Sequence, residues 1–281
     1  MELTSHARRS SLLLAVTAAV SLAVLAACAP LRSVVATTEG VMSTLAPAPP
    51  GRRVLAGVEG VCTASSINWI VPVTDGVVLV DAGFDETGAI LQRALHGRRV
   101  LAVLLTHAHP DHRAAAHLFN APVYLGAADV PLLEGRYRYR AVLAGLGAAI
   151  GIAPQPRTVI PVKDGDVLSI GGRTFAAVAL PGHTPGSTGW LTGELLFSGD
   201  AILSPNGDGI YPAPDSVTED MRQAYDSMRK LERLPVTTLL DAHFGTLHDP
   251  KRFLRAAIAR SDNEDTLYDH PAPRPVGCGE P

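Results

Sequence analysis

The feature that most constrains this chain is the block Thr106 to His112, which reads Thr-His-Ala-His-Pro-Asp-His. The apolar run Val100 to Leu105 directly before it predicts a buried strand, and Arg113 to Phe119 after it favours a helix. Imidazole nitrogens and carboxylate oxygens are the ligands that zinc, iron(II) and manganese prefer. A solvated His-rich turn is the alternative, but it would not need so many ligands side by side. The block therefore predicts a metal site at the carboxyl end of a strand.

Three more candidate ligands stand in the same kind of place. His183 lies in a Pro-Gly-His-Thr-Pro-Gly loop, Asp200 in Phe-Ser-Gly-Asp, and His243 in Leu-Leu-Asp-Ala-His. A single histidine or aspartate at a strand end is usually structural, but several of them in one chain favour a common site. The strands expected before them are Thr174 to Leu180, Leu195 to Phe197 and Thr237 to Leu240.

This order of ligands resembles the metallo-β-lactamase superfamily of metallohydrolases, over roughly Val54 to Leu247. The resemblance implies an α/β (α+β) fold, the four-layer αβ/βα sandwich with helices outside two central sheets. The chain departs from the family in having Ala242 where a glycine commonly precedes the last histidine. Carried over, the motif assigns one metal to His107, His109 and His183, the other to Asp111, His112 and His243, and a bridging role to Asp200.

The resemblance also implies the chemistry. Two divalent metal ions, zinc in the first place with iron or manganese as alternatives, would supply a metal-bound hydroxide as nucleophile at neutral pH. Asp111 could accept a proton as well as bind metal. Asp81 follows the apolar run Val77 to Val80 at a position that the family uses beside the metal block. We expect it to support the ligands without binding metal, the alternative being that it only caps a turn.

The substrate is less constrained. The bridging Asp200 resembles the glyoxalase II-like and lactonase-like dinuclear branch, which favours a small ester, thioester or lactone, with a β-lactam as an alternative. After His243 we expect only a short helix and a Pro-rich tail, and therefore no helical glutathione-binding domain of the kind that full-length glyoxalase II has. Two other functions remain open, a persulfide dioxygenase with a single iron and a non-catalytic metal-binding lipoprotein.

Two segments are candidates for the substrate pocket. The segment Arg136 to Arg140, with Arg136 and Tyr137, opens a Gly/Ala-rich insertion that we expect to be helical, and guanidiniums beside phenols could bind a carboxylate or phosphate. A solvated or membrane-facing basic face is the alternative. The loop Ser204 to Asp215 could place Tyr211 near a bound carbonyl, or it could be a simple surface loop.

The amino terminus predicts export. Arg8 and Arg9 precede an apolar stretch from Leu12 to Ala27 that ends in Leu-Ala-Ala-Cys, which resembles the lipobox of bacterial lipoproteins. Lipidation at Cys28 would anchor the enzyme to a membrane of the cell envelope, facing the extracytoplasmic side. A plain transmembrane anchor and an ordinary cleaved signal are the alternatives.

The remaining chain reads as one domain. We expect a signal peptide over residues 1–27, a flexible tether over 28–52, the hydrolase domain over 53–262 and a Pro-rich tail over 263–281. Cys62 and Cys278 could form a disulfide or remain two free thiols. The formal net charge of −3, without a basic face, argues against nucleic acid as a partner and favours a small-molecule substrate. The oligomeric state is left open.

Periodicity suggests further elements. Tight glycine turns are expected at Gly165, Gly171-Gly172 and Gly193. A helix over Val217 to Leu234 would start with a capping box at Ser216 to Glu219. Its apolar residues recur at helical spacing and predict a buried stripe on one face: Met221, Ala224, Tyr225, Met228 and Leu231. The other expected elements are strands at Ile67 to Val71, Val77 to Val80, Val123 to Leu125 and Val167 to Ile170, and helices at Glu86 to Leu95 and Lys251 to Arg260.

Overall fold

A computed structural model describes residues 52–55, 57–63, 66–83, 85, 87–141, 144–145, 154–263, 266–268 and 271. All of these belong to one compact unit, Gly40–Pro281. The predicted signal peptide, Cys28, almost all of the tether and Cys278 lie outside the described residues. Within the described part of the chain, no helix combines the length and apolar character needed to cross a membrane.

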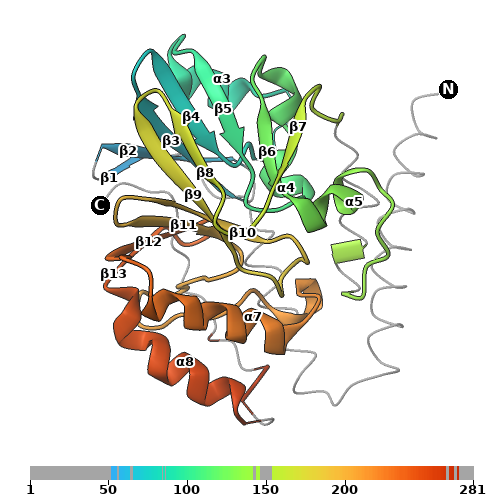
Figure 1. The fold of residues 1–281 in the computed structure, drawn as a ribbon, viewed down its shortest axis with the longest axis vertical. Coiled ribbons are helices and arrows are strands. Elements are labelled where there is room, and N and C mark those ends of the chain that lie inside the picture. Colours follow the sequence, from blue (N-terminus) through green and yellow to red (C-terminus); the bar gives the residue numbers. More distant parts are fainter. Residues whose placement is uncertain are drawn as a thin grey trace, which may run out of the picture. The chain divides into compact units, whose positions relative to one another are not determined.

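The first sheet has seven strands in sequential order (Figure 1). Its first four strands pair antiparallel, and the sheet becomes parallel from β4 onward. The strands are β1 (Arg52–Leu55), β2 (Val58–Cys62), β3 (Ile67–Val73), β4 (Gly76–Val80), β5 (Val100–Leu104), β6 (Val123–Gly126) and β7 (Val159–Val162).

The second sheet has six strands in the order β13-β12-β11-β10-β9-β8. Only the β11–β12 pair is parallel. β8 and β9 are joined by Gly171 and Gly172, which both have positive φ, as a two-residue hairpin turn requires. The strands are β8 (Val167–Ile170), β9 (Arg173–Ala179), β10 (Thr188–Thr192), β11 (Leu195–Gly199), β12 (Thr238–Asp241) and β13 (Thr246–His248).

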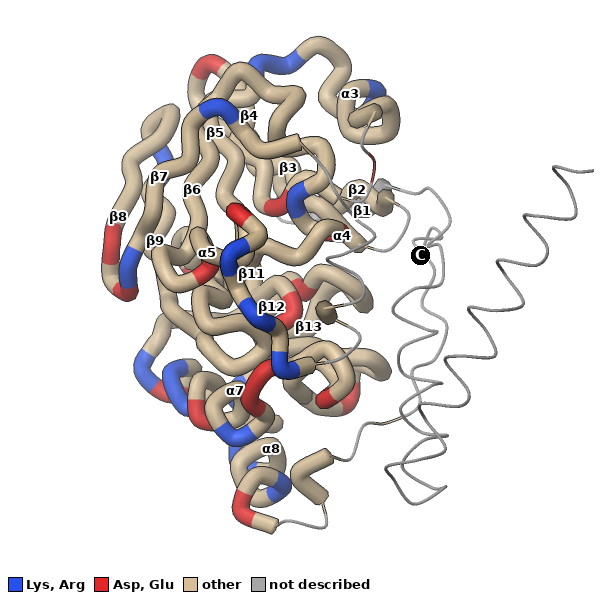
Figure 2. The backbone as a smooth tube through the Cα atoms, turned by 90° about the vertical axis from the view of Figure 1, so that its right-hand side faces the viewer, with Lys and Arg blue, Asp and Glu red and all other residues tan. Residues whose placement is uncertain are grey.

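Helices cover the outer face of each sheet. The short α3 (Ala89–Leu95), α4 (Pro110–Arg113) and α5 (Val130–Leu133) belong to the first sheet, whereas α7 (Met221–Met228) and α8 (Leu254–Ser261) lie beside the second (Figure 1). Charged residues recur along α7 and α8, while the central strands are largely free of them (Figure 2). This is the expected αβ/βα sandwich.

Burial on both faces explains the continuously apolar strands. In β4, Val78 and Val80 belong to the core between the sheets, whereas Val77 and Leu79 pack under the helices of the first sheet. Successive side chains of a strand point to opposite faces, so a strand covered on both sides must be apolar throughout. The apolar run Val77 to Val80 therefore forms a strand, as the sequence predicted.

The sequence-based elements needed several corrections. All eight expected strands are present within one or two residues of their predicted ends, but β1, β2, β7, β10 and β13 were not predicted. The expected helices start later or are shorter: α3 begins at Ala89, and Arg113 to Phe119 holds only the end of α4 and a 3-10 turn over Ala116–Leu118. In the stretch expected to be helical after Arg136, residues 136–141 are not helical, whereas the described residues Ala144 and Gly145 are.

The predicted capping box at the start of α7 is wrong. The helix begins at Met221, and its N-cap is Asp220, whose carboxylate accepts a hydrogen bond from the backbone N–H of Gln223 at 2.9 Å. Glu219 cannot complete a capping box because its carboxylate accepts hydrogen bonds from the backbone N–H groups of Arg140 and Ala141. The helix ends at Met228 and is followed by a 3-10 turn, Arg229–Glu232.

Cys62 ends β2 and is buried in the core between the sheets. It is disulfide-bonded. Of the two alternatives left open for Cys62, the free thiol is therefore excluded. Both other cysteines of the sequence, Cys28 and Cys278, lie outside the described residues.

Candidate metal centre

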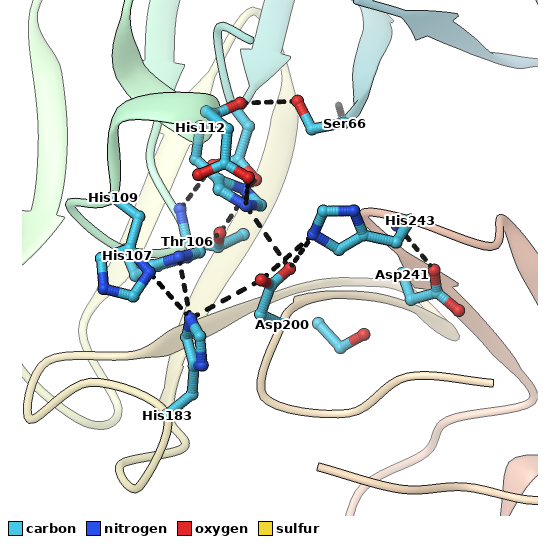
Figure 3. A network of polar contacts seen from close by, with 12 residues as sticks. Ser66, Thr106, His107, His109, His112, His183, Asp200, Asp241 and His243 are labelled. Carbon is cyan, nitrogen blue, oxygen red and sulfur yellow. Dashed lines mark hydrogen bonds and ion pairs between the residues drawn. The ribbon is translucent and has the colours of Figure 1, made fainter. Parts of the chain in front are cut away.

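The candidate ligands meet where strands of both sheets end. The Thr106–His112 block follows β5 in the first sheet, and Asp200 and His243 follow the neighbouring parallel strands β11 and β12 in the second. His183 comes from the loop between β9 and β10. Figure 3 shows these side chains turned toward one another across the junction of the two sheets. All seven residues that the sequence singled out as ligands are brought together.

One group consists of three buried histidines. His183 Nε2 lies 3.1 Å from His107 Nε2 and 3.0 Å from His109 Nδ1. The ring of His183 stands nearly perpendicular to the other two, at interplanar angles of 85° and 87°. Three ring nitrogens therefore converge on one point.

The second group is centred on Asp200. Its Oδ1 lies 3.0 Å from His243 Nε2 and 3.4 Å from His112 Nε2, while Oδ2 lies 3.1 Å from His243 Nε2 and 3.6 Å from His183 Nε2 in the first group. Asp111 Oδ2 lies 3.4 Å from His112 Nε2. One carboxylate thus faces both groups, which is the arrangement of a bridging ligand.

The two groups differ in protonation. Burial lowers the pKa of His107, His109 and His183, and neighbouring imidazoles lower it further for His107 and His183, to about 3 for His183. These three rings are neutral at pH 7. Burial also opposes a charge on His112, but nearby carboxylates, that of Asp111 foremost, raise its pKa.

The donor set fits two metal ions. Three neutral imidazoles each place a ring nitrogen around one point, with His183 Nε2 3.0–3.1 Å from the other two, and their lone pairs could bind a cation there. The Nε2 of His112 is buried without a hydrogen-bond partner among the described residues. Nitrogen and carboxylate oxygen without sulfur suit zinc, and also iron(II) or manganese. Three sets of ligand atoms lie within 4.8 Å of one another: His107, His109 and His183; His107, His112 and Asp200; and Asp111, His112 and His243.

Asp81 lies behind the first-sheet ligands, as expected. Its Oδ2 is 2.9 Å from His112 Nδ1 and accepts from the Thr106 hydroxyl at 2.8 Å, and its Oδ1 accepts from the Thr106 backbone N–H at 2.7 Å. A carboxylate at Nδ1 makes that nitrogen a donor, which leaves Nε2 of His112 free to bind metal. Asp81 has a φ of 62°, so the backbone is in the left-handed region to aim the carboxylate this way.

Asp129 was missed by the sequence reasoning. It is fully buried after β6, and its carboxylate accepts from the backbone N–H groups of Ala108 and Gly186 and from the Thr184 hydroxyl, at 2.7–2.9 Å. Burial raises the pKa of Asp129 to about 6, although these hydrogen bonds oppose the shift. The residue links the turn of His107 and His109 to the loop of His183. An aspartate at a strand end was its only signal in the sequence.

Asp241 holds the turn that carries the last ligand, His243, and the sequence reasoning missed it as well. Its Oδ1 accepts from the backbone N–H groups of His243, Phe244 and Gly245 at 2.6–3.0 Å. Its Oδ2 accepts from the backbone N–H of Ser204 at 3.0 Å, in the loop after Asp200. This one carboxylate shapes the turn that presents His243, despite Ala242 at the position where the family has glycine.

The candidate pocket residues lie in different surroundings. Arg136 is exposed and pairs with Glu134, and Tyr137 donates to a carboxylate oxygen of Glu219 at 3.2 Å. The Tyr211 ring packs under the Arg260 guanidinium, 4.1 Å from it. These contacts join the three side chains to Glu134, Glu219 and Arg260.

Tyr139, which the sequence reasoning did not single out, is the tyrosine that reaches the cluster. Its ring stacks on His109 with centroids 5.9 Å apart. Burial and the charge of Asp129 raise the pKa of Tyr139 to about 12.

Comparisons with known proteins agree with this geometry. The hydroxyacylglutathione hydrolase of Stenotrophomonas maltophilia is 31% identical over 178 residues, which cover 63% of this chain and 59% of that protein. The chain therefore spans less than two thirds of that relative's length.

Two solved structures share the fold. A β-lactamase domain protein from Burkholderia ambifaria superposes with a TM-score of 0.57 at 19% identity, over 75% of this chain and 72% of that one. TTHA1623, solved in a di-iron-bound form, gives a TM-score of 0.52 at 28% identity, over 66% of this chain and 90% of that one. The model of the metallo-beta-lactamase superfamily matches residues 61–243, most of the chain, and the chain belongs to this superfamily.

Proposed function

We propose that this protein is a dinuclear metal-dependent hydrolase of a small ester, thioester or lactone. The observation that carries the proposal is the position of Asp200, whose carboxylate lies 3.6 Å from His183 in one group and 3.0–3.4 Å from His112 and His243 in the other. A carboxylate that lies between two ligand groups can bridge two metal ions, whereas a single ion would need only one of the groups.

The proposed ligands are those predicted from the sequence. His107, His109 and His183 would hold one ion, Asp111, His112 and His243 the other, and Asp200 both. When bound, two divalent ions supply a nucleophilic hydroxide at neutral pH and polarise the carbonyl under attack.

Asp111 is the side chain best placed to move a proton. Its side chain is 28% exposed, whereas those of His112 and Asp200 are 0% and 8% exposed, so solvent reaches the cluster at Asp111. Burial would raise the pKa of Asp111, but the adjacent His112 outweighs this and lowers it. The carboxylate is ionised at neutral pH and can accept a proton from an attacking water.

A thioester is the substrate that we favour within this class. The relative from Stenotrophomonas maltophilia is named for hydrolysis of hydroxyacylglutathione, which is a thioester. Zinc is the metal that the donor set favours first, and the di-iron form of TTHA1623 supports iron as the alternative.

The test combines metal content with turnover on a panel of a thioester, a lactone, a cephalosporin and a phosphodiester. We expect two ions per chain and hydrolysis of a thioester or lactone, with kcat/KM reduced at least about 100-fold in Asp200→Ala. Asp208→Ala, an exposed aspartate in the following loop, is the matched control and should keep full activity. One iron per chain without any hydrolysis would contradict the proposal and favour the persulfide dioxygenase.

We further propose that the enzyme is exported and lipid-anchored through Cys28. The support is the Leu-Ala-Ala-Cys sequence after an apolar stretch and two arginines.

A further inference from the structure

An aromatic side chain outside the proposed ligand set borders the metal cluster. Tyr139 and His109 stack with an interplanar angle of 29°, and Tyr137 packs edge-on against Tyr139 with centroids 5.5 Å apart. Both tyrosines pack against the apolar cluster on the outer face of the first sheet. Tyr139 is only partly buried, so it presents aromatic surface directly beside a proposed ligand.

The two faces of this segment differ in chemistry. Arg136, Arg138 and Arg140 alternate with the tyrosines and are exposed. The arginine charges therefore lie in solvent, while the tyrosine rings pack against the apolar cluster and, through Tyr139, against His109. A flat group is what an aromatic ring in this position would bind.

Glu219 holds the segment in this position. Its Oε2 accepts from the backbone N–H of Arg140 at 2.8 Å and from the Tyr137 hydroxyl at 3.2 Å, and its Oε1 accepts from the backbone N–H of Ala141 at 3.2 Å. The backbone N–H of Glu219 donates to the carbonyl oxygen of His183 at 3.1 Å. One residue thus ties the tyrosine segment to a loop that carries a proposed ligand.

From this geometry we propose that Tyr139 contacts the acyl group of the substrate and favours flat acyl groups such as an aroyl group. Glu219 is the positioning residue that keeps Tyr139 against His109. The inference rests on the proposed function, because it assigns the acyl side of the same reaction.

The test uses two metal-binding probes that need no turnover. Acetohydroxamate and benzohydroxamate carry the same chelating group and differ in a methyl against a phenyl group. Their dissociation constants for the metal-loaded protein are measured by calorimetry. We expect benzohydroxamate to bind about five- to tenfold more tightly, as an added aromatic contact would give. Tyr139→Phe should keep this preference.

Removal of the ring should remove the preference. Tyr139→Ala, or Tyr139→Leu where volume must be kept, should weaken benzohydroxamate about fivefold and leave acetohydroxamate and metal content unchanged. With a hydrolysed ester series, the same variants should raise KM for aroyl substrates and leave kcat nearly constant. An unchanged ratio of the two dissociation constants in fully metal-loaded Tyr139→Ala would overturn the inference.

Glu219 is tested by the same ratio. Glu219→Ala should lower the benzohydroxamate preference as Tyr139→Ala does, and Tyr137→Phe, which loses one of the three hydrogen bonds, should lower it less. Glu232→Ala, an exposed glutamate beyond α7, is the matched control. A normal ratio in Glu219→Ala would refute the positioning role. Absence of hydrolysis on every substrate, with the ratio behaving as expected, would instead count against the proposed function alone.

Discussion

Three buried aspartates shape the turns that carry the candidate ligands. Asp81 accepts hydrogen bonds around the Thr106–His112 block, Asp129 joins that block to the His183 loop, and Asp241 shapes the His243 turn. Burial of a carboxylate is costly unless it is hydrogen-bonded, and each of these accepts at least three hydrogen bonds. At the residue scale, the site is therefore held by carboxylates that would not themselves bind metal.

Asp81→Asn tests this arrangement. The amide oxygen can still accept from the Thr106 N–H, but the NH₂ group would face His112 Nδ1 and favour the tautomer with a proton on Nε2, where the metal should bind. We expect metal affinity to fall about 10- to 100-fold, measured by competition with a chelating dye, and excess zinc to restore activity. Asp75→Asn is the control, because Asp75 is exposed and has a similar φ of 66°. Equal metal affinity in both variants would contradict this role.

At the scale of elements, α7 shows that a correct apolar pattern can come with a wrong start. The predicted stripe is buried, but the helix starts after Glu219 because that carboxylate binds the segment around Arg140. The capping box predicted from the local sequence does not form, because the Glu219 carboxylate makes a tertiary contact instead. The confirmed stripe consists of Met221, Ala224, Tyr225, Met228 and Leu231.

The observed N-cap of α7, Asp220, leads to a prediction about stability. Asp220→Ala removes the acceptor for the Gln223 N–H and should lower the free energy of unfolding by about 1 kcal/mol in urea denaturation. Asp220→Asn, which keeps an acceptor oxygen, should stay close to the wild type. Asp226→Ala, in the exposed part of the same helix, should cost only a few tenths of a kcal/mol. A loss in Asp220→Ala no larger than in Asp226→Ala would show that the cap is not formed.

At the scale of the whole molecule, the site depends on the junction of two sheets. The backbone N–H of Thr188 donates to Thr106 at 2.8 Å, and the indole N–H of Trp190 donates to Leu105 at 3.0 Å, so the second sheet is bonded to the end of β5. Gly199 lets β11 approach this strand, because a Cβ there would lie 2.4 Å from the Thr106 hydroxyl. Ligands from both sheets can therefore face one another.

The lipid anchor is also a property of the whole chain and stays a prediction. In a bacterial host, the wild type should partition into detergent and incorporate labelled palmitate, whereas Cys28→Ser should do neither. Ser33→Ala, a change in the same segment that keeps Cys28 and both other cysteines, is the control. Partition of Cys28→Ser into detergent would favour a transmembrane anchor, and a wild type in the aqueous phase would favour an ordinary cleaved signal.

The sequence alone determined which residues form the candidate metal cluster and, through its resemblance to the superfamily, the αβ/βα class. Ligand types in a fixed order and apolar runs of strand length are local patterns, and the seven candidate ligands could be read directly. Only the tertiary structure decided the role of Asp129 and Asp241, the start of α7 and the contact of Tyr139 with His109. These depend on hydrogen bonds and packing between segments far apart in the chain, for which no periodicity or motif exists.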